Sequence, residues 1–447
     1  MQNIQSKDIL VAAIDIETVF SAYAFSFHND FEKDPMNIIS NTWTSVSRPG
    51  MSIQVPTVVL LDKSKKFLAF GYDAEEQYLE LAIDEEHHDY YYFCGFNMLR
   101  HEIKQLTLQT MIKDDSGKQM PALEIISLVI KNLKCHLLKF LKPQDTGLVN
   151  DDIHWVVTVP AIWTESGKQF MREAAEKAGV SSEQLSVCLK PEAATLLCQH
   201  LLSDKLKDGD VIFNACKSSE KGAKCMVLDL GDEIDEITCL QKDADGSLLQ
   251  LEKPSGGPSV GFSVNEAFNQ FLIKIVGGPV FRKFQTEHKF GAKELLIDFK
   301  AKTMIFTKES VERITIKFPV SLLESFEKDT EEEIRDVIKQ MAYEGKVTWV
   351  GNKLRMDANI FRALFNEAKT HLIELVESLL TKSHLKDVST ILMVGSFSQS
   401  PIMQSAVKDA FPGMTVFAPP EPYLAVLKGA VIYGQRTIAQ LQNEKID

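Results

Sequence analysis

The feature that most constrains the fold is a strand–turn–strand pattern that occurs twice, far apart in the chain. In both copies an apolar run leads into an acidic turn and a second strand-like run follows. The first turn begins at Asp15 and the second at Asp229. The strands expected around them cover residues 11–14, 21–27, 225–228 and 237–240. Such self-similarity indicates a duplicated architecture in which each half contributes one hairpin to a shared cleft.

The composition of the two turns bears on what they can bind. Turns that hold phosphate are rich in glycine, because converging N–H groups require positive φ angles and no side chain in the way. Here Glu17, Asp232 and Glu233 add carboxylates to the turns. A carboxylate about 4 Å from a phosphate oxygen costs roughly 4 kcal/mol at an effective dielectric constant of 20. The pattern therefore predicts turns that disfavour phosphate.

Composition places the chain among globular proteins and excludes some partners. The 447 residues are 45% hydrophobic and 25% charged, which is ordinary for such proteins, and they suffice for several domain-sized units. A net charge of -13 without a long basic cluster argues against nucleic acid as a partner. We expect no membrane span. The N-terminus does not resemble a signal peptide, and the seven cysteines form no C-x-x-C pair, so we expect a cytoplasmic protein with reduced thiols.

Strand and helix patterns alternate along the chain. Residues 153–160 read as a buried strand that ends at a proline, and residues 390–396 as a buried strand that runs into a turn of small residues. Amphipathic helices are expected at 121–141 and 164–179, with a closing helix at 422–441. This alternation predicts an α/β fold with mixed sheets that are covered on both faces.

Two further stretches leave alternatives open. Residues 256–261 read as a glycine-rich turn before a helix that starts near Asn265. Such a turn can bind phosphate, but Pro258 removes one N–H donor and makes the signal weak. The aromatic run at 87–96 either stacks a ligand or packs one subdomain on another, and packing is the favoured interpretation.

Several motifs resemble one family, in order, over roughly residues 8 to 436. They are VVTVPAIW at 156–163, KQFMREAA at 168–175, KPEAA at 190–194, GGP at 256–258, LRM at 354–356, VGSF at 394–397 and LKGAVIYG at 427–434. Together they are similar to the ATPase domain of the heat-shock 70 kDa chaperone family, specifically its divergent twelfth subfamily. The resemblance implies an actin-like ATPase fold, with two lobes around a nucleotide cleft. Each lobe would have a core mixed sheet of about five strands and an accessory subdomain.

The resemblance also implies domain boundaries. Lobe I would span 1–205, with a core hairpin at 8–28, an accessory subdomain at about 40–118 and further core at 119–205. An inter-lobe loop at 206–222 would lead to lobe II at 223–420, whose core is 223–268 and 357–420 and whose accessory subdomain is about 269–356. Residues 421–447 would form a closing helix that returns to lobe I. The family's peptide-binding domain would follow that helix, and we expect none within these residues.

The family's retained site positions are implied by the same match. Asp15 and Asp229 would hold a magnesium ion through water, and Glu192 would position metal-bound water, so these three carboxylates are the catalytic candidates. Thr18 would contact phosphate. The other implied nucleotide-binding positions are Gly231, Gly256, Gly257, Gly395, Ser396, Lys300 and Lys302.

Other positions depart from the family pattern. Asn97 stands where the family has its catalytic lysine, which removes a positive charge that stabilises phosphoryl transfer. Glu17, Asp232 and Glu233 replace glycines of the turns, Ile234 replaces a threonine, Ser396 replaces a glycine, and Glu236 falls at a second aspartate.

These departures leave three functional hypotheses. The favoured one is a degenerate member with weak or no ATP hydrolysis that binds another ligand or a protein partner. The second is an active, ATP-binding chaperone module, with ATP or ADP and magnesium as cofactors, if the acidic side chains point away from the cleft. The third is a cleft that binds a sugar or another polar small molecule, by analogy with other proteins of this fold.

Overall fold

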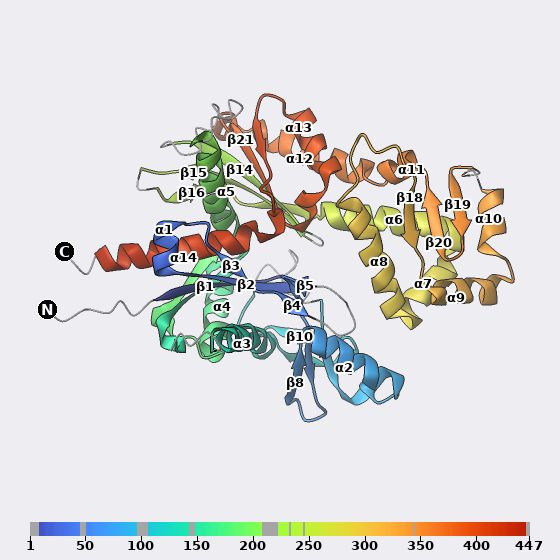
Figure 1. The fold of residues 1–447 in the computed structure, drawn as a ribbon, viewed down its shortest axis with the longest axis horizontal. Helices are drawn as coiled ribbons and strands as arrows, with labels where there is room; N and C mark the ends of the chain where they lie inside the picture. Colours follow the sequence, from blue (N-terminus) through green and yellow to red (C-terminus); the bar gives the residue numbers. More distant parts are fainter. Residues whose placement is uncertain are drawn as a thin grey trace. The chain divides into compact units, whose positions relative to one another are not determined.

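The structure, a computed structural model, describes residues 9–44, 51–95, 106–142, 148–207, 222–231, 234–244, 246–341, 343 and 345–443. The chain forms two compact units. The first contains Met1–Gly222, Leu240–Ser255 and Leu424–Asp447, and the second contains Ala223–Cys239 and Gly256–Tyr423 (Figure 1). Asn97, Asp232 and Glu233 lie outside the described residues.

The first main sheet has six strands in the order β13-β12-β1-β2-β3, with β6 paired to β2. Its central strand β1 pairs in parallel with β12 and antiparallel with β2. Apolar residues fill both faces, as expected of a sheet covered on both sides. The strands are β1 Leu10–Ile16, β2 Phe20–Phe27, β3 Ile39–Ser40, β6 Val55–Pro56, β12 Ile153–Val159 and β13 Leu185–Leu189.

The second main sheet repeats this topology. Its order is β22-β21-β14-β15-β16, with β17 paired to β15, and β14 pairs in parallel with β21 as β1 does with β12. The strand order thus repeats, as the two hairpins predicted, although each sheet has six strands where about five were expected. The strands are β14 Lys224–Leu230, β15 Ile234–Lys242, β16 Leu248–Gln250, β17 Ser255–Pro258, β21 Thr390–Val394 and β22 Thr415–Phe417.

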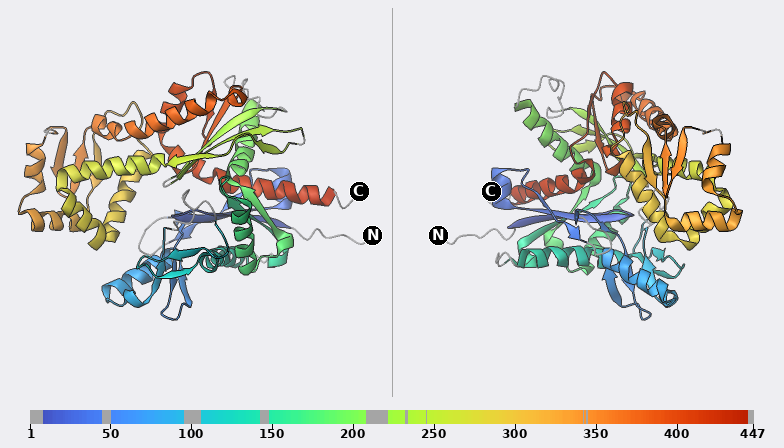
Figure 2. Two further views of the ribbon diagram at one scale, coloured as in Figure 1. Left: turned by 180° about the vertical axis from the view of Figure 1, so that it is seen from behind. Right: turned by 45° about the vertical axis from the view of Figure 1, so that its right-hand side comes forward.

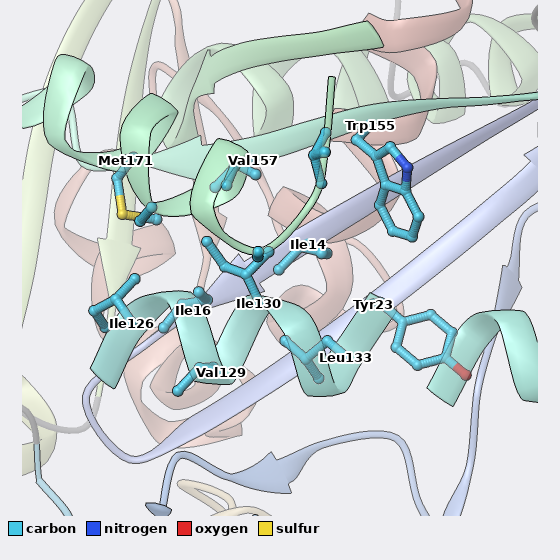
Figure 3. Packing of buried hydrophobic residues seen from close by; sticks show 14 of the residues in the cluster. Ile14, Ile16, Tyr23, Ile126, Val129, Ile130, Leu133, Trp155, Val157 and Met171 are labelled. Carbon is cyan, nitrogen blue, oxygen red and sulfur yellow. The ribbon is translucent and has the colours of Figure 1, made fainter. Parts of the chain in front are cut away.

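Helices cover both faces of the first sheet. Helix α3, Ala122–Leu141, packs its apolar side on Ile14 and Ile16 of β1, together with α4, Glu165–Lys177 (Figure 3). Successive strand residues point to opposite faces, so Val11 points the other way, towards α14, Ala425–Asn443. Helix α5, Lys190–Lys207, packs against α14. Figures 1 and 2 show α3 and α14 on opposite sides of β1 and β2.

Gly429 lets α14 approach α5 closely. A Cβ atom at this position would overlap the backbone carbonyl group of Ala193, and backbone cannot move aside as a side-chain tip can. We expect Gly429→Ala to lower the free energy of unfolding by about 2–4 kcal/mol, in the range of overpacked cores and strained backbone. Urea denaturation would measure this. The matched control is Gly413→Ala, where nothing lies within 4 Å, and a loss as large in the control would contradict the packing argument.

The aromatic run of the sequence packs within one small subdomain of the first unit. Strands β7 Val59–Leu61, β8 Phe67–Phe70 and β9 Tyr91–Phe93 form a sheet beside helix α2, Tyr72–Ile83. Tyr92 of β9 stacks on Tyr78 of α2 with ring centroids 3.9 Å apart. Burial raises the pKa of Tyr78 to about 12. Tyr92 therefore packs a helix on a sheet within this subdomain, while Phe93, next to it, belongs to the buried apolar cluster of the first main sheet.

Shorter elements complete the two units. In the first unit they are α1 His28–Lys33, β4 Trp43–Thr44, β5 Met51–Ser52, β10 Met111–Lys113 and β11 Gln119–Pro121. The second unit adds a three-stranded sheet of β18 Ile314–Lys317, β20 Lys353–Met356 and β19 Val347–Val350. Its helices are α6 Val260–Val276, α7 Gly278–Glu287, α8 Lys289–Thr303, α9 Val320–Thr330, α10 Ile334–Gln340, α11 Ala358–Ala363, α12 Asn366–Leu380 and α13 Pro401–Ala410.

None of the described helices is both long enough and apolar enough to cross a membrane.

Candidate functional site

Asp15 lies near the end of β1, where the first hairpin begins. Its side chain is 10% exposed. The Thr158 hydroxyl group, on the neighbouring parallel strand β12, donates a hydrogen bond to Asp15 Oδ1. Asp15 is therefore fixed in a buried position before any ligand arrives.

Lys190, the first residue of α5, supplies a positive charge at this hairpin. Its Nζ lies 3.0 Å from Asp15 Oδ1 and 3.0 Å from Glu17 Oε1. The lysine side chain is 9% exposed and Glu17 is 41% exposed. Two carboxylates and one ammonium group thus form an ion cluster, which we call the Asp15–Lys190–Glu17 cluster. In the sequence, Lys190 stood out only as part of the KPEAA motif at 190–194, which does not indicate this role.

A backbone hydrogen bond within the first turn holds the rest of it in place. The Glu17 backbone N–H donates to the Phe20 carbonyl oxygen at 3.0 Å, and Thr18 is buried between them at 7% exposure. The turn therefore places the Glu17 side chain beside Lys190 while it buries Thr18.

Glu192 follows two residues after Lys190 on α5. Burial raises the pKa of the Glu192 carboxyl group above its usual value, while a backbone hydrogen bond at Leu189 and the charge of Lys168 act in the opposite direction. Glu192 in turn contributes to the raised pKa of the buried Cys188 thiol, for which burial is the larger cause. Glu192 is thus hydrogen-bonded at the end of β13 and feels the charge of Lys168 on α4.

In the second unit, Asp229 lies against Gly395. Asp229 on β14 is paired in register with Val394 on β21, and Gly395 follows directly with φ 88°. A Cβ atom on Gly395 would lie 2.5 Å from the Leu230 carbonyl oxygen and closer still to Asp229 Oδ1. Only glycine allows this approach, so the structure brings these two predicted site residues together.

Asp235 is the acidic residue around which the second hairpin is hydrogen-bonded. Its Oδ1 accepts from the Gly231 N–H at 3.1 Å, and its Oδ2 accepts from the Val260 N–H at 2.7 Å. Ser259, between these segments, donates to the Gly231 carbonyl oxygen at 2.7 Å. The Asp235 residue is 5% exposed. Burial, with a smaller contribution from Asp229, raises its pKa to about 8 against the pull of the two backbone hydrogen bonds.

The glycine-rich segment differs from its prediction as a turn. Gly256 and Gly257 belong to strand β17, which pairs with β15. Helix α6 starts at Val260 instead of near Asn265, because Ser259 caps it by accepting from the Phe262 N–H at 3.3 Å. Asn265 lies inside α6 at 9% exposure, and its Oδ1 has no hydrogen-bond partner among the described residues.

The remaining predicted ligand-binding residues lie in two other elements of the second unit. Ser396 starts a short 3-10 turn after Gly395, and its buried hydroxyl oxygen lacks a hydrogen-bond partner within the described part of the chain. Lys300 and Lys302 lie in the last turn of α8, where Lys302 Nζ is 4.0 Å from Asp298 Oδ1.

The residues around Asp15 do not fit a magnesium ion. Where the chain is described, no group of three or more His, Cys, Asp or Glu side chains is arranged to hold a metal. Asp15 Oδ1 already pairs with the Lys190 ammonium group. A divalent ion about 4 Å from that group would be repelled by roughly 8 kcal/mol at an effective dielectric constant of 20.

Comparison with known proteins gives one consistent result. No family model matches the chain. The chain is 31% identical, over 480 aligned residues, to heat shock 70 kDa protein 12B of Homo sapiens, and the match covers 96% of this chain and 69% of that protein. It is 30% identical to heat shock 70 kDa protein 12A of Mus musculus and of Homo sapiens, over 96% of this chain and 70% of each relative.

Proposed function

Because the chain belongs to the heat shock 70 kDa protein 12A/12B family, we propose that it is a heat-shock-70-like nucleotide-binding-domain protein with degenerate phosphate turns. In this proposal its two units form the actin-like fold, with Asp15 and Asp229 facing one cleft. The cleft binds a polar ligand, or the module binds a protein partner, with little or no ATP hydrolysis. The Asp15–Lys190–Glu17 cluster is the observation that carries this proposal.

The cluster supports the proposal that catalysis is weak, because the Lys190 ammonium group pairs with the carboxylate that would hold the metal. Lys190 Nζ contacts Asp15 and Glu17 at 3.0 Å, so the carboxylate that would hold the metal's water shell is already paired. The cluster has two negative charges and one positive charge. Its net negative charge disfavours a triphosphate, and it lacks the divalent charge that stabilises phosphoryl transfer.

The same cluster makes a hydroxylated ligand the second candidate. Glu17 remains 41% exposed while it pairs with Lys190. Its carboxylate group can therefore accept hydrogen bonds from a sugar or another polyol without breaking the ion pair. Calorimetry with magnesium-ATP, magnesium-ADP and a panel of neutral sugars on one preparation would separate these ligand classes.

We expect ATP turnover close to the uncatalysed background. Lys190 takes the place of a metal ion, and Asn97 provides no positive charge for the transferring phosphoryl group. A steady-state phosphate-release assay with magnesium-ATP would measure the rate. Asp229→Ala is the control for contaminating ATPases, since it should leave a background rate unchanged. A rate typical of active family members that Asp229→Ala abolishes would contradict the proposal.

A further inference from the structure

The hydrogen bonds of Asp235 point to an occupied anion site in the second unit. Its two carboxyl oxygens accept from two N–H groups that belong to different segments, Gly231 after β14 and Val260 at the start of α6. N–H groups at a glycine-containing turn and at a helix N-terminus are the donors that bind phosphate or carboxylate groups. Here a side chain of the same protein fills that position.

We propose that Asp235 is a built-in ligand of the Gly231 and Val260 N–H groups, and that it excludes an external phosphate or carboxylate group from them. This inference rests on the proposed function, because it specifies the ligand class at the second of the two hairpins. As long as Asp235 occupies these two N–H groups, the second hairpin binds only a ligand that places no charged group there.

Geometry makes the contact specific to Asp235. Successive residues of a strand point to opposite faces, so Glu236 on the same strand points away from these donors. Glu236 is also buried, at 7% exposure, and Thr238 Oγ1 lies 3.4 Å from its Oε1. Glu236 is therefore a matched control: a neighbouring buried carboxyl group that points to the opposite face of the strand.

Burial and hydrogen bonding hold Asp235 in this position. The side chain stays bonded to both N–H groups at 5% exposure. An incoming anion has to displace it and cannot bind beside it.

The test uses small anions without metal or nucleotide. Asp235→Ala frees both donors and leaves a space that formate can enter. We expect sodium formate to raise the melting temperature of Asp235→Ala relative to sodium chloride at equal ionic strength, with no such difference for the wild type or for Glu236→Ala. In calorimetry with EDTA, inorganic phosphate should bind Asp235→Ala at least about tenfold more tightly than the wild type.

A second variant guards against a failure to fold. Asp235→Ser retains a small polar side chain that cannot reach both N–H groups, and it should show the same formate effect. If either variant folds only when formate is present, that result also supports the proposal. If the variants respond equally to formate and chloride, or if formate restores neither, Asp235 is not a built-in ligand.

The outcome is independent of ATP hydrolysis. Wild-type turnover at a normal family rate would overturn the proposed function and leave the formate result standing. A missing formate effect together with background turnover would overturn only the role of Asp235.

Discussion

The wild-type protein should lose stability as the pH rises, and Asp235→Asn should remove this loss. The pKa of Asp235 is raised in the folded protein from the ordinary 3.8 to about 8. The Asp235 carboxyl group therefore keeps its proton in the folded protein through a pH range in which it loses the proton in the unfolded chain. The stability that the protonated Asp235 contributes is complete below about pH 4 and disappears as the pH rises towards about 8. With roughly 1.4 kcal/mol for each unit of the shift from 3.8 to about 8, the loss amounts to about 6 kcal/mol.

Asparagine does not titrate, so the variant should lack this slope. The free energy of unfolding can be measured in urea between about pH 4.5 and about pH 8.5. The value for Asp235→Asn should rise relative to the value for the wild type as the pH rises. Glu374→Gln is the control, because it removes an exposed carboxylate on α12 and should leave the slope nearly unchanged. If the free energies of unfolding of the wild type and Asp235→Asn change in parallel with pH, the pKa of Asp235 is not raised in the folded protein.

Lys190→Met should destabilise the first unit by about 3–5 kcal/mol at neutral pH. The substitution removes the ammonium group from a pair in which Lys190 is 9% and Asp15 10% exposed, and it leaves a buried carboxylate without its cation. Glu17, at 41% exposure, should contribute less, because solvent screens its charge. Urea denaturation at constant pH would measure the loss.

A second lysine tests whether burial is the reason. Lys224 Nζ lies 2.7 Å from Asp387 Oδ1, but Asp387 is 66% exposed. Lys224→Met should therefore cost only about 1 kcal/mol or less. Equal losses for the two variants would mean that burial of the Asp15–Lys190–Glu17 cluster is not what makes it important.

The two main sheets were predictable because their signals are local. Apolar runs that end at Asp15 and Asp229 identify strands by composition alone, and their repetition identified the two sheets of equal topology. The glycine-rich segment was misjudged because pairing of β17 with β15, a tertiary interaction, overrides the local preference of Gly256 and Gly257 for turns.

The charges of the site were not predictable in the same way, because their partners are distant in sequence. Glu17 and Lys190 are 173 residues apart, and Asp235 and Val260 are 25 apart. A shift of one residue in a strand exchanges its two faces, so sequence alone could not decide between Asp235 and Glu236. Residues two apart on a helix also point in different directions, and it is Lys190, rather than Glu192, that contacts Asp15.

The claim that Lys190 takes the place of a metal ion is tested most directly by titrating magnesium into the wild type and Lys190→Met. If the claim holds, calorimetry should detect no magnesium binding that depends on Asp15 in the wild type. Lys190→Met should gain such binding, because Asp15 and Glu17 then lack a cation and magnesium binds through one or two carboxylates. Asp15→Asn in the Lys190→Met background should remove it again. The contradicting result is magnesium binding to the wild type that Asp15→Asn abolishes and Lys190→Met leaves unchanged.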